Sequence, residues 1–379
     1  MKKIIWIIVI VAVIGIVWSY SQKTENPAPP VTTEPIKIGL ITPLTGDAAA
    51  LGEFVKNVTE LAIEEINQAG GINGQPIEVV YEDGKCSGAP SVSAAQKLIS
   101  SDKVKIIFGY ECSGGVLAML PVTDRAGVFV FSGSATSPDL SGKSPLFTRT
   151  IPSDAGQGRA LAEMAIAKGW KNIAVIQESS DYALGIFRAF ENNYPVTVGT
   201  ITKEEYPANT TDFRSILTKA KSTKPDAILF IPQSPSTAER LIKNFSDLKW
   251  TVPVMANDAV GGNPPLVKMF KQILEGALVA EQFLDQSNTK FQDLNANYQI
   301  KYGKELVYKS YGQAIYDSIY LTKDGLTQFG NDPQKIASWV RTVKDWEGAS
   351  GKVTIDSNGD RIGGFVIKII KDGEIVEIK

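Results

Sequence analysis

IKIGLITPLTGDAAALGEFVKNVTELAIEEI, residues 36–66, contains a predicted strand, a loop and a predicted helix in direct succession. The β-branched run at 36–42 predicts the strand, and Pro43 ends it in a glycine-containing loop. Between residues 51 and 66 apolar side chains recur at three- and four-residue spacing, until Gly70-Gly71 stops the pattern. That spacing is typical of an amphipathic helix. The stretch therefore predicts the first strand–helix unit of an α/β fold.

The same alternation of strand and helix continues through most of the chain. Further strands are predicted at 77–81, 104–108, 128–131, 172–177, 196–201, 227–232 and 252–256, and helices at 91–99, 115–126, 156–168, 183–192, 212–221 and 237–248. Such alternation predicts parallel sheets with helices on both faces, in two lobes that meet near Pro152. The last third is predicted to form helices at 291–302, 313–327 and 333–343 and then a hairpin at 364–378.

Composition excludes several classes of function. The 379 residues include no histidine, which excludes a serine–histidine or cysteine–histidine catalytic arrangement and every histidine-ligated metal site. A net charge of −2 with scattered basic residues gives no reason to expect a nucleic acid partner. Phosphate-binding and dinucleotide-binding glycine motifs are absent from the predicted strand ends. We therefore expect no cofactor, no metal site and no catalysis.

The N-terminus predicts export. MKK precedes a fifteen-residue apolar run at 4–18, which is typical of a signal peptide and short for a spanning helix. Residues 1–21 are therefore either a cleaved signal peptide or an uncleaved membrane anchor. The proline-rich segment 22–35 is predicted to be a linker. Both alternatives place the rest of the chain on the periplasmic or extracellular side, with membrane contact only through this segment.

The two cysteines are Cys86 and Cys112, the second within the stretch GYECSGG at 109–115. In an oxidising compartment an even count of two suggests one disulfide. The bridge would close a loop of 27 residues, counting both ends, and stabilise the fold by about 3–4 kcal/mol on the loop-entropy model. The alternative is a pair of free, buried thiols.

Polar loops follow the predicted strands, where ligands bind in open parallel sheets. Ser113 precedes a predicted helix. It either binds the carboxylate of a ligand or simply caps the helix N-terminus. Ser134, Ala135 and Thr136, with a carbonyl, an amide and a hydroxyl, suit a carboxylate and an amine, or else form a polar turn. The candidates beyond residue 152 are Tyr182, to stack on a ligand or merely to anchor its helix, and Asp258, to pair with an ammonium group or merely to be solvated.

Residues 36–86, with the pattern PLTG…LG…A…INQAGGINGQ, are similar to the opening of branched-chain amino-acid binding proteins, the type I periplasmic binding proteins that feed ABC importers. SGSATSPDL at 132–140 and YGQAIYDSIYL at 311–321 resemble the same family less specifically. The resemblance implies a two-lobed α/β fold, each lobe a parallel sheet flanked by helices, joined by three crossovers. Lobe one would be 36–152 plus 283–355, and lobe two 153–282 plus 356–379.

The resemblance also implies roles for the candidate residues. Cys86 would bridge to Cys112, Ser113 would bind the ligand carboxylate, and the loop at 134–136 would grip both the carboxylate and the ammonium. Tyr182 matches a family tyrosine, and Asp258 matches the acidic partner of the ammonium, although glutamate is usual there. The sequence departs from the family pattern at two positions of the pocket for the ligand side chain. Leu51 stands where family members often have an aromatic residue, and no tyrosine lies near Gln233, where one is common.

Together these features predict a monomer that captures an amino acid, most readily a branched-chain or aliphatic one, and delivers it to an ABC transporter permease. Three alternatives stay open. The ligand is an amide, urea or aromatic acid; the chain is a ligand-sensing module of the same fold; or it is an enzyme that uses a serine–lysine or carboxylate pair. No Ser-x-x-Lys motif lies at a plausible strand end, which weighs against the last.

Overall fold

The computed structural model describes residues 34–283 and 285–378. The predicted signal or anchor segment 1–21 and nearly all of the linker 22–35 lie outside the described residues. Within those that are described, no helix has both the length and the apolar character needed to span a membrane.

The first sheet has five parallel strands in the order β2-β1-β3-β4-β5. They are β1 (Ile36–Thr42), β2 (Ile77–Asp83), β3 (Ile106–Gly109), β4 (Phe129–Ser132) and β5 (Phe147–Arg149). One face of the sheet packs on α2 (Ala49–Gln68) and α12 (Lys309–Phe329), and the other on α3 (Gly88–Ser100) and α4 (Ser113–Arg125). Because both faces are covered, the central strands β3 and β4 are buried along their whole length, whereas the edge strand β2 carries polar, partly exposed residues.

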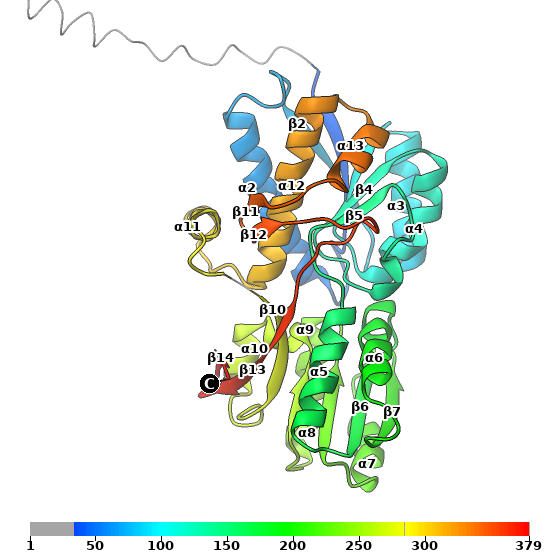
Figure 1. The fold of residues 1–379 in the computed structure, drawn as a ribbon, viewed down its shortest axis with the longest axis vertical. Coiled ribbons are helices and arrows are strands. Elements are labelled where there is room, and N and C mark those ends of the chain that lie inside the picture. The colour runs from blue at the N-terminus through cyan, green and yellow to red at the C-terminus, as the bar shows by residue number, and fades with distance from the viewer. Residues whose placement is uncertain (1–33, 284, 379) are drawn as a thin grey trace, which may run out of the picture.

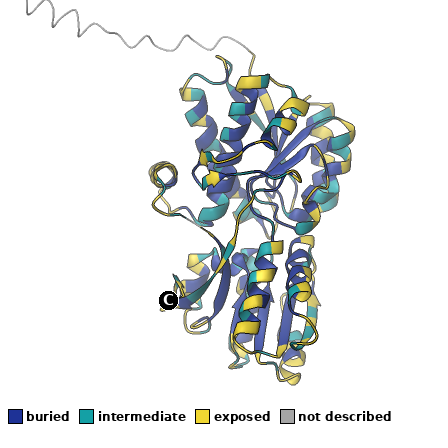
Figure 2. Cartoon of the chain, viewed as in Figure 1, coloured by how far each residue is buried: buried dark blue, intermediate teal, exposed yellow. Residues whose placement is uncertain are grey.

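The second sheet has seven strands in the order β14-β13-β10-β9-β8-β6-β7. Its parallel strands are β6 (Asn172–Glu178), β7 (Thr200–Tyr206), β8 (Ala227–Ile231), β9 (Val254–Ala256) and β10 (Leu278–Gln282), and the antiparallel hairpin β13 (Phe365–Lys371) and β14 (Glu374–Glu377) extends the edge beside β10. One face packs on α5 (Ala155–Ala167) and α6 (Asp181–Asn193), and the other on α7 (Arg214–Ser222) and α8 (Pro235–Asp247). In Figure 2 both sheets are buried between helices whose outer faces are exposed.

The chain passes between the two sheets three times: after β5, after β10 and before β13 (Figure 1). After β10 it returns to the first sheet to add α11 (Thr289–Tyr302), α12, α13 (Pro333–Val340) and the small hairpin β11 (Trp346–Gly348) and β12 (Gly351–Val353). Two short helices, α9 (Asp258–Gly261) and α10 (Pro264–Met269), follow β9. The predicted α/β architecture with parallel sheets and three crossovers is therefore confirmed.

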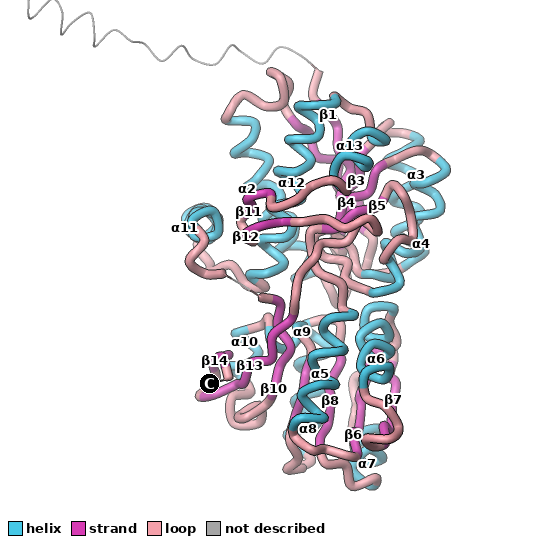
Figure 3. Tube along the Cα trace, in the orientation of Figure 1, coloured by secondary structure: helices cyan, strands magenta, loops and turns pink. Residues whose placement is uncertain are grey.

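One predicted strand is wrong in position, and four were missed. The strand predicted at 196–201 is instead β7 at Thr200–Tyr206, because residues 195–199 form a turn in which the Val198 N–H donates to the Pro195 carbonyl (2.8 Å). β7 lies at the sheet edge and exposes the polar side chains of TITKEEY, so it lacks an apolar run. The strands β5, β11 and β12 have three residues each and appear as brief segments between loops in Figure 3. The missed strand β10 is longer and is paired on both sides, with β9 and β13.

Arg149, at the end of β5, links two of the crossovers to a loop of the first lobe. Its side chain is fully buried, and its Nε lies 2.7 Å from Asp360 Oδ1 in the third crossover. Its Nη1 donates to the carbonyls of Ala135 (3.1 Å) and Ser137 (2.9 Å). Gly133 precedes this loop, and a Cβ there would lie 2.6 Å from the backbone of Ile315 in α12. The loop at 134–137 is thus fixed between α12 and the crossovers.

Candidate ligand-binding site

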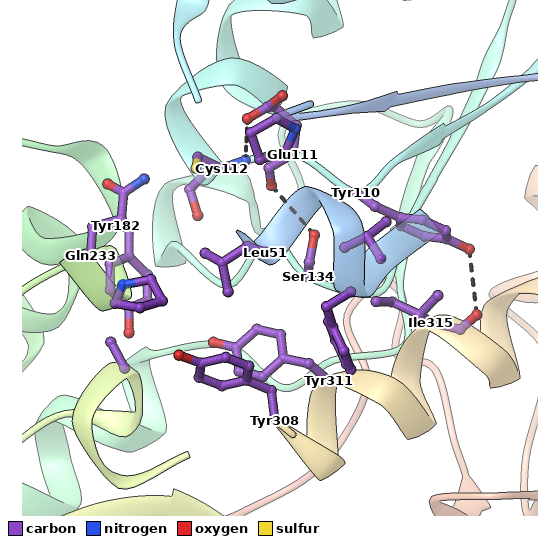
Figure 4. A pocket seen from close by; sticks show the side chains of 16 residues that line it. Leu51, Tyr110, Glu111, Cys112, Ser134, Tyr182, Gln233, Tyr308, Tyr311 and Ile315 are labelled. Atoms are coloured by element: carbon purple, nitrogen blue, oxygen red, sulfur yellow. Dashed lines mark hydrogen bonds between the residues drawn. The ribbon is translucent and has the colours of Figure 1, made fainter. Parts of the chain in front are cut away.

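A cavity of about 90 Å³ lies between the two lobes. Because one water needs roughly 10–15 Å³ on this measure, the cavity has room for several waters or a small ligand. Its walls come from both lobes (Figure 4) and comprise Pro43, Leu51, Phe54, Val55, Tyr110, Glu111, Cys112, Ser113, Ser134, Tyr182, Gln233, Pro235, Ala259, Tyr308, Tyr311 and Ile315. Most of these side chains are apolar or aromatic, which suits a ligand with an apolar part.

The aromatic wall comes from residues that the sequence did not indicate. Leu51 lies at the centre of the close-up, and Tyr308 and Tyr311 face it from the start of α12 (Figure 4). Tyr110 adds a third ring at the end of β3. The cavity therefore has aromatic walls although residues 51 and 233 are not aromatic.

Ser113 lies at the first turn of α4 and lines the cavity with only 2% of its surface exposed. Its Oγ accepts a hydrogen bond from the Ser137 N–H (3.1 Å), which leaves the hydroxyl proton available to a ligand. The N-terminus of a helix carries partial positive charge and unpaired N–H groups. Ser113 is therefore placed where a carboxylate is stabilised.

The three loop residues differ in position. Ser134 lines the cavity, and its Oγ donates to the Glu111 carbonyl (3.4 Å). Ala135 is fully buried, and its N–H donates to Ser132 Oγ (3.0 Å). Thr136 is also fully buried behind the cavity wall, and its Oγ1 makes no hydrogen bond with the described residues. Only Ser134 reaches the cavity directly, and Thr136 retains an unused hydroxyl.

Asp258 and Tyr182 are in direct contact. Asp258 begins α9, is 2% exposed, and its Oδ1 accepts a hydrogen bond from the Tyr182 hydroxyl while Oδ2 accepts one from Tyr311 (2.7 Å). Burial raises the pKa of the Asp258 carboxyl, although these hydrogen bonds partly oppose the shift. The two tyrosines line the cavity and Asp258 lies just behind them, so the carboxylate is one side-chain layer from the cavity.

Two further carboxyl groups lie near Asp258, the fully buried Asp154 and the partly buried Glu281, and no sequence pattern indicated either. Asp154, before α5, accepts a hydrogen bond on Oδ1 from Gln157 (3.0 Å), while its buried Oδ2 has no partner among the described residues. Glu281, on β10, likewise has a buried and unpartnered Oε1. Burial, and after it the charge of Asp258, raises the pKa of both groups. No local motif marks them, because they reach the site only through the crossovers.

Cys86 and Cys112 lie side by side with a Cα–Cα distance of 5.0 Å, the arrangement that the predicted disulfide requires. Cys112 lines the cavity, and Gln233 from the second lobe donates from Nε2 to Cys86 Sγ (2.7 Å). The Cys112 N–H donates to Glu111 Oε1 (2.8 Å). The bridge thus fixes the loop before Ser113 and contributes a contact between the lobes.

Glu111 is a buried carboxyl group beside the disulfide, and burial raises its pKa to about 8. The folded chain then keeps a proton that the unfolded chain releases between pH 4.5 and about 8. We expect stability to fall as the pH rises through this window, by up to about 1.4 kcal/mol per pH unit, and Glu111→Gln to remove this component. Urea unfolding of both chains at several pH values measures it; parallel pH profiles would contradict the assignment.

Two α/β lobes with a ligand-sized cavity between them define the type I periplasmic binding protein fold. Residues 35–366 match the family model described as periplasmic binding protein, and the chain belongs to that family. Its members are solute-binding proteins rather than enzymes.

Individual relatives cover nearly the whole chain. The Leu/Ile/Val-binding protein BraC3 of Rhizobium johnstonii is 28% identical over 340 residues, which span 87% of this chain and 90% of that protein. The leucine-binding protein LivK of Thermotoga maritima is 27% identical with a TM-score of 0.82, and covers 91% of this chain and 98% of that one. LivJ of Streptococcus pneumoniae, solved with isoleucine, is 26% identical with a TM-score of 0.80, and covers 90% of this chain and 97% of that one.

Proposed function

We propose that this chain is an extracytoplasmic substrate-binding protein that captures an amino acid with an aliphatic side chain and delivers it to an ABC importer. The observation that carries this proposal is the buried Asp258 carboxylate behind one wall of a largely apolar cavity, with Ser113 at a helix N-terminus lining the same cavity. A zwitterionic amino acid needs one protein group that stabilises its carboxylate and another that stabilises its ammonium. Its aliphatic side chain needs an apolar pocket. The chain binds its ligand and makes or breaks no bond.

The proposed grip uses Ser113, Ser134, Ala135, Thr136, Tyr182 and Asp258. The ligand carboxylate would lie at the start of α4, beside the Ser113 hydroxyl and Ser134. The ammonium group would lie between the Thr136 hydroxyl and Asp258. It would replace the hydrogen bond that the Tyr182 hydroxyl donates to Asp258. Leu51, Tyr110 and Ile315 would contact the side chain.

Ligand capture would be coupled to lobe closure. The proposed lobes are 36–152 plus 283–355 and 153–282 plus 356–379, which rotate about the three crossovers. Contacts such as Gln233 Nε2 to Cys86 Sγ, and the ion pair of Arg188 with Asp139 (3.2 Å), join the lobes around the cavity. We further propose export through the N-terminal segment, presentation to a permease and a monomeric state.

The names of the relatives support an aliphatic amino acid, since three of them are described as leucine-, isoleucine- or valine-binding proteins. The four tyrosines that line the cavity favour an aromatic carboxylic acid as a second candidate. Asp258 weighs against it, because a ligand with only a carboxylate offers no cationic group to pair with this buried carboxyl.

A thermal-shift screen of the purified chain tests the proposed function. The ligands are the twenty amino acids, simple amides and aromatic acids. A ligand at about a hundred times its Kd stabilises the folded state by about 2.7 kcal/mol, which raises the melting temperature measurably. We expect leucine, isoleucine or valine to give the largest shift. A shift given only by an amide or an aromatic acid would overturn the amino-acid assignment.

Ser113→Ala is expected to weaken amino-acid binding about tenfold, because one hydrogen bond to a charged carboxylate is lost. Isothermal titration measures the change. The matched control is Ser93→Ala, since Ser93 is an exposed serine on α3 whose hydroxyl donates only to its own helix. Equal affinities for Ser113→Ala and the unaltered chain would remove Ser113 from the site.

A further inference from the structure

More carboxyl groups surround the proposed ammonium position than the single positive charge of one bound amino acid can neutralise. Gln157 bridges two of these groups: its Nε2 donates to Asp154 Oδ1 (3.0 Å), and its Oε1 accepts from the Asp258 N–H (3.3 Å). Glu281 Oε1 lies against Gly261 in the short helix that Asp258 begins, where a Cβ would come within 2.1 Å of it. The charge of Asp258 accordingly raises the pKa of both Asp154 and Glu281. An amino acid brings a single positive charge. Three ionised carboxylates would therefore leave two negative charges buried, at a cost of several kcal/mol per ion.

Among the described residues, no basic side chain forms an ion pair with this cluster. The charge of Arg149 partly opposes the rise in the pKa of Asp154, but Arg149 donates to Asp360 and to two carbonyl groups. The charge of Lys368 on β13 likewise partly opposes the rise in the pKa of Glu281. The other titratable groups that face the cluster are tyrosines: Tyr182 from α6, and Tyr308 and Tyr311 from the start of α12.

Hydrogen bonding also leaves the cluster incomplete. Among the described residues, no donor lies in good hydrogen-bond geometry to the buried Asp154 Oδ2 or Glu281 Oε1. The Thr136 hydroxyl lies near Asp154 and only partly opposes the rise in the pKa of that carboxyl. Asp258, by contrast, accepts hydrogen bonds from two tyrosines. An unpartnered buried carboxylate oxygen is costly when charged and far less so when protonated. The empty site therefore favours carboxylic acid forms of Asp154 and Glu281.

We propose that Asp154, Asp258 and Glu281 share protons in the empty site, and that the ammonium group of a bound amino acid displaces one of them, so that ligand affinity decreases as the pH is lowered. The inference rests on the proposed function. An ammonium group stabilises the ionised carboxylate, so binding lowers the affinity of the cluster for protons. By linkage, ligand affinity then rises with pH, by up to about tenfold per pH unit for one released proton.

Isothermal titration of the full chain with leucine, at about pH 6 and in two buffers of different ionisation enthalpy, tests the inference. A released proton is taken up by the buffer, so we expect the apparent enthalpies to differ by about one buffer ionisation enthalpy. Equal enthalpies in the two buffers from about pH 5 to about pH 8, with leucine bound, would overturn this inference alone. Absence of leucine binding would overturn it together with the proposed function.

Variants locate the proton. Asp154→Asn and Glu281→Gln preserve shape and remove one titrating group each, so each is expected to reduce the proton number and flatten the pH profile of the affinity. The matched control is Glu178→Gln, because Glu178 is also a buried carboxyl group whose pKa is raised by burial but lies outside the cluster. If only the control variant altered the proton number, the cluster would be the wrong source.

Discussion

Replacing Asp258 with asparagine is expected to weaken amino-acid binding by about a hundredfold or more, while leaving the fold intact. The reason is that truncating one partner of a buried charge pair costs about 2–5 kcal/mol, which corresponds to factors of about 30 to several thousand. Asparagine keeps the size of the side chain and one acceptor for the tyrosine hydroxyls, but it leaves a ligand ammonium unpaired.

Denaturant unfolding distinguishes a loss of ligand binding from misfolding of the variant. Because burial raises the pKa of Asp258, the ionised carboxyl is disfavoured in the empty protein, and Asp258→Asn is expected to unfold at an equal or higher denaturant concentration. Asp247→Asn, which alters an exposed aspartate at the end of α8, is the matched control and should bind normally. Undiminished binding by Asp258→Asn would exclude Asp258 as the ammonium partner.

Removal of the disulfide has the second largest expected effect. The double change Cys86→Ser and Cys112→Ser opens a loop that the bridge closes over a sequence separation of 26, and we expect a loss of about 3–4 kcal/mol of stability. Urea unfolding measures this loss. Ligand affinity should fall as well, because Cys112 lines the cavity and Cys86 Sγ accepts the interlobe hydrogen bond from Gln233.

Reduction of the unaltered chain provides the control. A thiol reductant should lower its stability to that of the double variant and should leave the double variant unchanged. If the reductant destabilised both chains equally, or neither, the bridge would not be the source of the difference.

The fold was largely predictable because its strands are buried on both faces. The apolar runs at 36–42, 172–177 and 227–232 coincide with β1, β6 and β8 to within one residue at each end. A run of apolar residues is missing where a strand is exposed on one side or is very short. β7 exposes polar residues at the sheet edge, and β11 and β12 have three residues each. Edge and short strands derive their pairing from neighbours that a sequence pattern does not contain.

The site was predictable only in part. Ser113, Ser134 and Tyr182 line the cavity because each lies in the loop or first helical turn after a parallel strand, where ligand-binding loops are expected. Tyr308 and Tyr311 come from the chain after the second crossover, and Tyr308 adopts a left-handed backbone conformation (φ 49°) that no periodicity indicates. Asp154 and Glu281 likewise flank crossovers, so their proximity to Asp258 depends on how the lobes meet.

In the proposed function, the cleft binds a zwitterionic amino acid through its ammonium group. Isothermal titration of the purified chain with leucine and with 4-methylpentanoic acid tests it most directly, because the two ligands share a carboxylate and a side chain and differ in the amine. We expect saturable binding of leucine and at least about a hundredfold weaker binding of the acid, because the acid lacks the ammonium group that pairs with Asp258. Equal or tighter binding of 4-methylpentanoic acid would contradict it.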